Sequence, residues 1–395
     1  MVAVIKKSKQ KVPDGTLNKV ILLVETSRAF GRELLYGIAR YSKLHGPWAF
    51  YREPRNLKSQ VPHLKNWQAD GVIMRNSIIT KELLNLNLPS IMVLHDPQRP
   101  GNIPAVVTDG FQISKLAAEH LMNRGMRNFA FCGIEGFYWS DERKKHFEKI
   151  ISEAGYKTFI YGEGIPKKYK TWEREQSQMA EWLKTLPKPV GIMTCNDDRG
   201  NYVLEACKIA NLRVPEDVSV IGVDNDPLVC DLCDPPLTSI ALNTESAGYS
   251  AAELLDRLMN GESMNGQEIT VTATHVIRRQ STDILAIEDN EVVSAIRFIR
   301  QNAKSKIRVN DVVEQTCLSR RSLESRFRNI LNRSIQEEIR KVRTDLISQM
   351  LIETNLSIAE ITAMLNFTDF EHISRYFKKE KGISLREFRK INSHC

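Results

Sequence analysis

The sequence predicts a two-lobed α/β domain followed by an all-α domain with two helix-turn-helix units. Over residues 18–283, short apolar strands alternate with amphipathic helices, which is typical of parallel sheets covered on both faces. These strands are too many for one sheet in a segment of this length, so we expect two lobes, each with its own sheet. From residue 292 to residue 395 the segments have helical spacing, and the polar residues 284–291 are predicted to be the linker.

Composition and charge favour a globular protein with an anionic partner. Of the 395 residues, 42% are hydrophobic and 26% charged, which is ordinary for globular chains, and no apolar run is long enough to span a membrane. The first residues lack the apolar core of a signal peptide, so we expect a cytoplasmic protein with a basic, disordered leader at residues 1–17. The net charge of +8 is concentrated in this leader and in residues 288–395, which indicates that the helical domain binds the anionic partner.

The cysteines indicate neither a disulfide framework nor a metal site. Seven scattered cysteines, an odd number in a long chain, are typical of a reducing compartment. Cys230 and Cys233 form a CxxC pair, but no second pair follows at the spacing of a zinc site. The alternative is two ordinary thiols beside the turn at residues 234–236, so we predict no metal and no cofactor.

The strands are expected where apolar runs end at a turn or a polar residue. They are residues 20–24, 71–74, 90–94, 105–107, 129–132, 191–194 and 218–223. The helices between them are residues 31–44, 113–124, 141–153, 173–186, 199–211 and 246–260. Parallel strands joined by helices require right-handed crossovers, so both lobes should be doubly wound.

Polar and aromatic side chains follow several of these strands, at the edge where open α/β sheets bind ligands. Carboxylates, amides and an arginine form directional hydrogen bonds with hydroxyl groups, and aromatic rings offer a flat apolar wall, so this set suits a polyhydroxylated ligand. The predicted ligand-binding residues are Ser27, Arg28, Phe30, Asp109, Trp139, Arg143, Asn196, Asp197 and Asp224. For any single Asp or Asn at a strand end the alternative is a helix cap, and Arg143 alone could be a solvated helix residue.

Four short motifs, in order, resemble the LacI/GalR-type sensor domains, which share the periplasmic-binding-protein fold. They are the V-x-G-x-D pattern at residues 220–224, the pair Asn196-Asp197, Arg143 in the run 141–143, and the R-x-S-T strand at residues 276–282. The resemblance covers about residues 18–283 and implies a periplasmic-binding-protein-like sensor in which Asp224 and Arg143 contact a sugar or purine effector. The family's Gly-Phe pair after that arginine is absent, because lysines follow it here.

Two segments of the C-terminal region have the pattern of helix-turn-helix units. In the first, a short helix and a three-residue turn precede Ser319, a good N-cap for a helix with Leu323 and Phe327 on one face. The second unit repeats this design, with Ile373 and Phe377 as the pair that faces the core.

A continuous helix predicted at residues 335–353 separates the two units. At 1.5 Å per residue it spans about 28 Å, close to the ~34 Å between successive major-groove faces on one side of DNA. The alternative is a helical bundle with basic surface helices, which the tandem units and the basic excess make a weaker explanation.

Residues 292–390 resemble the AraC/XylS-type DNA-binding domain. The family's terminal signature is matched by Phe367, Asp369, Arg375, Phe377, Lys378, Lys379, Gly382 and Arg389, whereas Asn366, Ile373 and Leu385 replace its usual Gly, aromatic residue and Pro. The resemblance implies that outward residues early in each second helix read bases, as Arg does with guanine and Glu with cytosine. These residues are Arg321, Glu324, Ser325, Glu371, His372 and Arg375. The residues expected to hold phosphates are Arg320, Arg328, Lys378 and Lys379.

A LacI-like sensor placed before an AraC-like DNA-binding domain resembles the architecture of the xylose operon regulators. This resemblance implies a sugar-responsive transcription regulator, an activator of pentose (D-xylose) catabolism genes. Its expected partners are double-stranded operator DNA, the sugar, RNA polymerase and a second copy of the chain in a homodimer.

One alternative is a regulator of the same architecture with a different sugar or small molecule as effector, and two other classes of function are further alternatives. A sugar-modifying enzyme fused to a DNA-binding domain would need a catalytic motif, and the sequence has no Walker A loop, G-x-S-x-G, H-E-x-x-H or dinucleotide fingerprint, so no catalytic residues are predicted. A periplasmic binding protein is disfavoured by the absent signal peptide and the basic helical tail.

Overall fold

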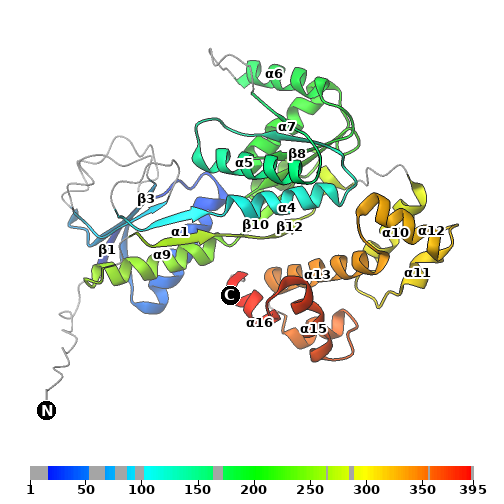
Figure 1. Ribbon diagram of the computed structural model, residues 1–395. Coiled ribbons are helices and arrows are strands. Elements are labelled where there is room, and N and C mark those ends of the chain that lie inside the picture. Colours follow the sequence, from blue (N-terminus) through cyan, green and yellow to red (C-terminus); the bar gives the residue numbers. More distant parts are fainter. Residues whose placement is uncertain are drawn as a thin grey trace.

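The computed structural model describes residues 17–52, 67–75, 87–93, 102–162, 172–263, 266–283, 289–354 and 356–392. Two α/β lobes are followed by a helical domain that lies against one side of them (Figure 1). The predicted fold class is confirmed. The predicted leader lies almost entirely outside the described residues, and so does most of the predicted linker.

The first lobe, which we call the N-lobe, has a six-stranded parallel sheet in the order β11-β5-β4-β3-β1-β2. Its strands are β1 (Asn18–Leu23), β2 (Trp48–Arg52), β3 (Gly71–Arg75), β4 (Ser90–Val93), β5 (Ala105–Thr108) and β11 (Glu268–Val271). Helices α1 (Ala29–His45) and α9 (Thr244–Met259) pack on each other closely because Gly37 and Gly248 face the partner backbone. A Cβ on Gly37 would lie 1.9 Å from the carbonyl oxygen of Glu245, so no larger residue fits there.

The second lobe, the C-lobe, has a six-stranded sheet in the order β12-β10-β9-β8-β6-β7, in which β12 runs antiparallel to β10. Its strands are β6 (Asn128–Cys132), β7 (Thr158–Ile160), β8 (Val190–Thr194), β9 (Val218–Val223), β10 (Thr238–Leu242) and β12 (Ala273–Ile277). Its helices are α4 (Gly110–Met122), α5 (Tyr138–Glu153), α6 (Trp172–Thr185), α7 (Asp197–Ala210) and α8 (Pro227–Leu232).

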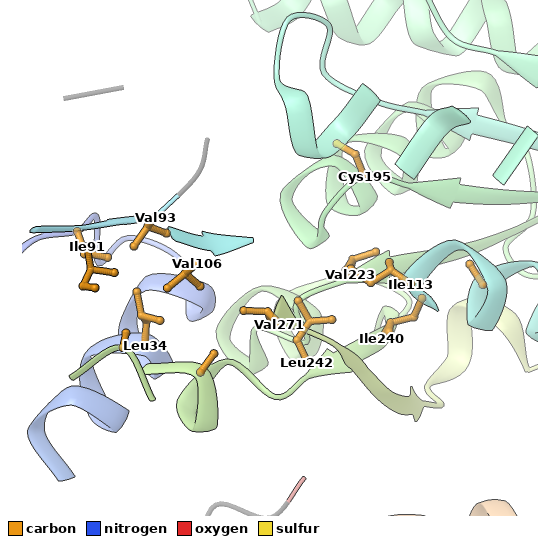
Figure 2. Close-up of a cluster of buried hydrophobic side chains, with 14 of the residues drawn as sticks. Leu34, Ile91, Val93, Val106, Ile113, Cys195, Val223, Ile240, Leu242 and Val271 are labelled. Carbon is orange, nitrogen blue, oxygen red and sulfur yellow. The ribbon is translucent and has the colours of Figure 1, made fainter. Parts of the chain in front are cut away.

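The chain crosses between the lobes three times, at Asp109, Asn243 and Thr272. These residues are joined by hydrogen bonds: the Asn243 N–H donates to the Thr272 carbonyl (3.1 Å), and the Asp109 N–H donates to the Val271 carbonyl (2.9 Å). Figure 2 shows buried apolar side chains that continue from the N-lobe through Leu242 and Val271 into the C-lobe. The three connecting segments and the shared apolar core thus join the two lobes at one place, which we call the hinge.

The sequence located all seven of its predicted strands, although residue 94 lies outside the described residues. It missed β2, β7, β10 and β11, which are edge strands or end at the hinge and lack a long apolar run. The closing strand expected at residues 276–282 lies earlier than predicted: β12 runs from Ala273 to Ile277, and Gln280–Thr282 forms a 3-10 turn. The Ser281 hydroxyl in that turn donates to the Val220 carbonyl (2.7 Å) and ties the chain to β9 as it leaves the sensor.

The helical domain consists of α10 (Asn290–Gln301), α11 (Val309–Val313), α12 (Arg320–Leu331), α13 (Ile335–Glu353), α14 (Ile358–Met364), α15 (Phe370–Lys381) and α16 (Leu385–Asn392). Helix α13 spans both units, because Ile339 belongs to the core of the first and Leu351 to the core of the second. Ser319 caps α12 and Asp369 caps α15 by accepting backbone N–H bonds, which fixes where each second helix begins.

Candidate functional site

A cavity lies between the two lobes, at the carboxyl ends of their strands, and encloses about 450 Å³ with its open mouth included. We call it the inter-lobe cavity. Six predicted ligand residues line it: Arg28, Phe30, Trp139, Arg143, Asn196 and Asp224. Three further lining residues were not predicted: Arg75, Val93 and Thr108.

Arg143 and Asp224 form the charged floor of the inter-lobe cavity. Arg143 projects from α5, is only 2% exposed, and donates a hydrogen bond to the Cys195 carbonyl. Its Nη2 lies 3.8 Å from Oδ1 of Asp224, and its guanidinium carbon lies 5.3 Å from the centre of the Trp139 ring. Burial raises the pKa of Asp224 to about 6, although the nearby guanidinium groups of Arg143, Arg28 and Arg75 act in the opposite direction.

The backbone after β9 turns sharply to present Asp224. This residue has φ of 100° and the next, Asn225, has φ of 49°, so two consecutive residues lie in a region that glycine usually occupies. Asp and Asn tolerate such a conformation better than most residues, and the Asp224 N–H still donates to the Ile240 carbonyl (3.0 Å). Backbone strain of this kind is typical of functional sites.

Three buried polar atoms on this cavity wall have no hydrogen-bond partner among the described residues. They are Oδ1 of Asp224, Nε of Arg143 and Nδ2 of Asn196. Because buried polar groups are almost always paired, and an unpaired one costs about 1–3 kcal/mol, a concave wall with three of them is built to receive a polar ligand.

Two sets of contacts join the lobes directly beside the inter-lobe cavity. Nε of Arg28, at the start of α1, donates to Oδ2 of Asp198 at 2.5 Å. Asp226 accepts from the Ala29 N–H (2.9 Å) and from Nη2 of Arg32 (2.7 Å). The N-terminal end of α1 therefore rests on the loop ends of the C-lobe.

The remaining predicted ligand residues lie near the cavity but do not line it. Asp197 is buried below, where its carboxylate accepts from the Asp226 N–H (2.7 Å) and the Ser239 hydroxyl (2.5 Å). Asp109 lies at the hinge and caps α4 by accepting from the Gln112 N–H (2.9 Å). Ser27 donates to Glu25 at the cavity rim. Their part in ligand binding stays a prediction.

Arg75 shows what the sequence could have revealed. It is the last residue of β3, whose apolar run was predicted to stop at residue 74, and its buried guanidinium lies 4.0 Å from Oε2 of Glu25. The rule that selected Asp224, a charged residue at the carboxyl end of an apolar strand, would have selected Arg75 too. Thr108, at the end of β5, follows the same rule, whereas nothing distinguishes Val93 from an ordinary strand residue.

The second helices of both helix-turn-helix units present a polar face, as predicted. Leu323, Phe327, Ile373 and Phe377 are fully buried. The exposed predicted DNA contacts are Arg320, Arg321, Ser325, Arg328, Glu371, Arg375, Lys378 and Lys379.

Two predicted base-reading residues are half-buried and already engaged. Oε2 of Glu324 lies 3.4 Å from the Ile335 N–H, at the start of α13. Nδ1 of His372 lies 3.1 Å from the Thr368 hydroxyl. Base reading by either residue would require these local bonds to be shared or exchanged.

The comparisons with known proteins cover both parts of the chain. Residues 118–282 match the model of a periplasmic binding protein-like domain, and residues 312–391 match that of a helix-turn-helix domain. The chain is 30% identical over 385 residues to the xylose operon regulatory protein of Escherichia coli K12, across 95% of this chain and 98% of that protein. It is also 30% identical over 380 residues to the xylose operon regulatory protein of Haemophilus influenzae, across 94% and 98%.

A solved structure extends this similarity to the whole fold. The structure of a xylose-binding transcription activator superposes with a TM-score of 0.60 at 30% identity and covers 96% of this chain and 99% of that one. The sensor part alone resembles a cellobiose-bound transcriptional regulator, with a TM-score of 0.56 at 21% identity over 68% of this chain and 86% of that one, which shows the fold only.

Proposed function

The chain belongs to the family of the xylose operon regulatory proteins, which are sugar-sensing transcription regulators and not enzymes, and on this basis we propose that its effector is a pentose, D-xylose in particular. We further propose that it activates genes for pentose catabolism, as a homodimer that recruits RNA polymerase.

The observation that carries the sugar proposal is the set of unpartnered polar atoms in the inter-lobe cavity. Sugar hydroxyl groups donate to Oδ1 of Asp224 and accept from Nε of Arg143 and Nδ2 of Asn196, so one polyhydroxylated ring satisfies all three. Trp139 and Phe30 supply the apolar wall for the ring face.

The sugar would act by favouring closure of the lobes. Arg28, Phe30 and Arg75 belong to the N-lobe, whereas Arg143, Asn196 and Asp224 belong to the C-lobe, so a ligand touching both sets binds the closed state more tightly. Only such differential affinity shifts the equilibrium between open and closed states. The Arg28–Asp198 and Arg32–Asp226 ion pairs form across the closing lobes and add to the stability of that state.

The movement would reach the DNA through the C-lobe. Nη2 of Arg333, just before α13, donates to Oδ1 of Asn123 after α4 (2.5 Å), and Nη2 of Arg127 donates to the Ile330 carbonyl at the end of α12 (2.6 Å). These bonds seat the first helix-turn-helix unit on the C-lobe, so rotation of this lobe carries the unit with it. In a homodimer, paired through the sensor lobes, the rotation changes the spacing of the two DNA-binding domains.

DNA recognition follows from the exposed faces of α12 and α15. We propose that Arg321, Ser325, Glu371 and Arg375, with Glu324 and His372 after local rearrangement, contact base edges in successive major grooves. Arg320, Arg328, Lys378 and Lys379 would hold the phosphates on either side and so position the helices without reading sequence.

The test is a ligand screen of the full-length protein by thermal shift, with D-xylose, L-arabinose, D-ribose, D-glucose and adenine. A true effector at 100 times its dissociation constant adds about 2.7 kcal/mol of stability. The same sugar should change the affinity or footprint on operator DNA in a gel-shift or footprinting assay. A hexose or purine that binds while pentoses do not would overturn the pentose assignment, and a sugar without effect on DNA binding would overturn the mechanism.

A further inference from the structure

A second, larger cavity lies between the sensor and the helical domain. It encloses about 1410 Å³, with its open mouth included, and shares no lining residue with the inter-lobe cavity. Its walls come from α4 and β12 on the sensor side and from α10, α13 and the end of α15 on the other side. Figure 1 shows α13 running alongside this face of the C-lobe. We call it the inter-domain cavity.

We propose that the inter-domain cavity binds a small phosphate-bearing anion through Arg124, Arg278, Arg300, Arg333 and Lys341. Two of these cations come from the sensor, after α4 and after β12, and three come from the helical domain. This site is independent of the pentose proposal, because the sugar would occupy a different cavity.

Three cations of the inter-domain cavity have no close ion-pair partner among the described residues. No carboxylate of the described residues lies within 4.0 Å of Arg278, Arg300 or Lys341, in contrast to the surface lysines of the sensor helices. The side chain of Arg124 is 3% exposed, and its partner Asp283 lies 3.4 Å away and is itself 73% exposed. Arg333 is the exception, with Oε2 of Glu338 at 2.7 Å.

Most carboxylates around the inter-domain cavity are already engaged with other groups. Glu380 is paired with Arg340 (3.3 Å) and Asp345 with Lys381 (3.6 Å). Glu337 accepts from the Ser334 N–H (2.7 Å) in the capping box of α13, whose N-cap is Ser334. Glu119 and Glu338 also line the cavity, so five carboxylates stand beside six cations among its described lining residues, which leaves a small positive excess.

The electrostatic effects on neighbouring groups agree with a cluster of like charges that the nearby carboxylates offset only in part. Burial, together with the charges of Arg300 and Arg278, lowers the pKa of Arg124. Burial and the charges of Arg124, Arg278, Arg300 and Lys341 hold the pKa of His120 well below its usual range, so this side chain stays neutral and bonds to the Thr282 hydroxyl (2.9 Å). An anion in the cavity would relieve this repulsion.

A phosphate group fits this arrangement better than a carboxylate or a halide. It offers three acceptor oxygens with a charge near −2, and the planar guanidinium fork binds two of them at once. Because the cations belong to both domains, a bound phosphate would bridge Arg124 and Arg278 to Arg300 and Lys341. It would thereby stabilise one placement of the DNA-binding domain on the sensor and act as a second input to regulation.

The experiment measures binding of sodium phosphate and of D-ribose 5-phosphate to the full-length protein, by calorimetry and thermal shift, against sodium chloride at equal ionic strength. We expect saturable binding that Arg300→Gln weakens at least about tenfold, the loss of one charge-assisted hydrogen-bonding group. The matched control is Arg297→Gln, an exposed arginine on the same helix outside the cavity, which should bind as the unaltered protein does.

Further readouts keep the proposal open to refutation. Without phosphate, Arg300→Gln should melt no lower than the unaltered protein, because it removes one of several like charges; if it does not fold, Lys341→Gln replaces it. Tighter binding of the sugar phosphate than of inorganic phosphate would identify an organic phosphate, and equal affinity would identify phosphate itself. Shifts no larger than those with chloride, equal effects of the two arginine variants, or a loss of operator affinity in Arg300→Gln without any phosphate binding would overturn the proposal.

Discussion

Replacing Asp224 by Asn removes a charge from the inter-lobe cavity and leaves its shape intact. Asn has the same size and also tolerates positive φ, so the turn after β9 should be kept. Among the described residues that line this cavity, Asp224 is the one carboxylate, and it shares the cavity with three guanidinium groups. The substitution therefore tests whether its charge holds the sugar.

The expected loss of sugar affinity follows from Oδ1 of Asp224, which has an ion-pair contact with Arg143 but no hydrogen-bond partner among the described residues. A hydrogen bond to a charged group contributes about 1.5–3 kcal/mol, so the dissociation constant should rise by a factor of roughly 10 to 150. The stability of the sugar-free protein should not fall in the same way. Folding raises the pKa of Asp224 from its ordinary 3.8 to about 6, so at pH 7 its ionised form costs on the order of 3 kcal/mol. The Asn variant recovers part of this cost, while Arg143 loses its partner.

The assay is isothermal calorimetry with D-xylose at pH 7, together with the melting temperature of the sugar-free protein. The matched control is Asp231→Asn, the same change on a carboxylate that is 63% exposed, paired with Arg279 and outside the cavity. We expect the Asp224 variant to bind sugar far more weakly while melting at the same or a higher temperature. Unchanged affinity, or equal losses in both variants, would refute the role given to Asp224.

The remaining predictions concern pH, the helical domain and DNA. Because the sugar should bind the ionised form of Asp224, affinity should fall about tenfold for each pH unit below about 6 and level off above it; a flat profile between pH 5 and 7 would exclude this coupling. Arg343 is 6% exposed, donates to the Leu365 carbonyl (2.5 Å) and lies 4.3 Å from the Phe367 ring centre. Arg343→Ala should therefore lower the unfolding free energy of the second helix-turn-helix unit by about 2–4 kcal/mol, as measured by urea unfolding. Its sugar affinity should not change and serves as the control. Arg321→Ala should weaken binding to operator DNA by about 1–3 kcal/mol and relax specificity at one base position. Lys379→Ala should instead weaken binding to every DNA sequence alike, and the slope of log affinity against log salt concentration should fall by about one. Equal slopes and equal specificity in the two variants would contradict these roles.

The pattern of the sequence was sufficient for the regular parts of the fold. Continuous apolar runs such as residues 218–223 identify a strand buried on both faces, and the pairs Leu323–Phe327 and Ile373–Phe377 identify the inner faces of the second helices. Edge strands such as β2 and β11 each bury a single residue among half-buried and exposed ones, so their pattern does not stand out from that of a loop.

The candidate site, too, could be predicted from the sequence only in part. A charged or aromatic residue after an apolar strand is visible in the sequence, which is why Arg28, Asp224 and Asn196 were found. Whether such a residue faces the cavity, caps a helix or supports the site from below depends on backbone turns of a few residues. Asp197 and Asp198 are neighbours, yet the first is buried under the sheet edge and the second reaches across to Arg28.

By itself, the sequence determined the two-part architecture, most of the buried strands, and the edge of the sheets where polar groups gather, because these depend on local periodicity and on residue type. Only the tertiary structure decided which polar atoms are left without partners in the inter-lobe cavity, and that Arg124, Arg278, Arg300 and Lys341 meet between the two domains. These arrangements join residues that are up to about 200 positions apart in the chain. Their proximity is fixed by how the lobes and the helical domain pack, which no local pattern of residues encodes.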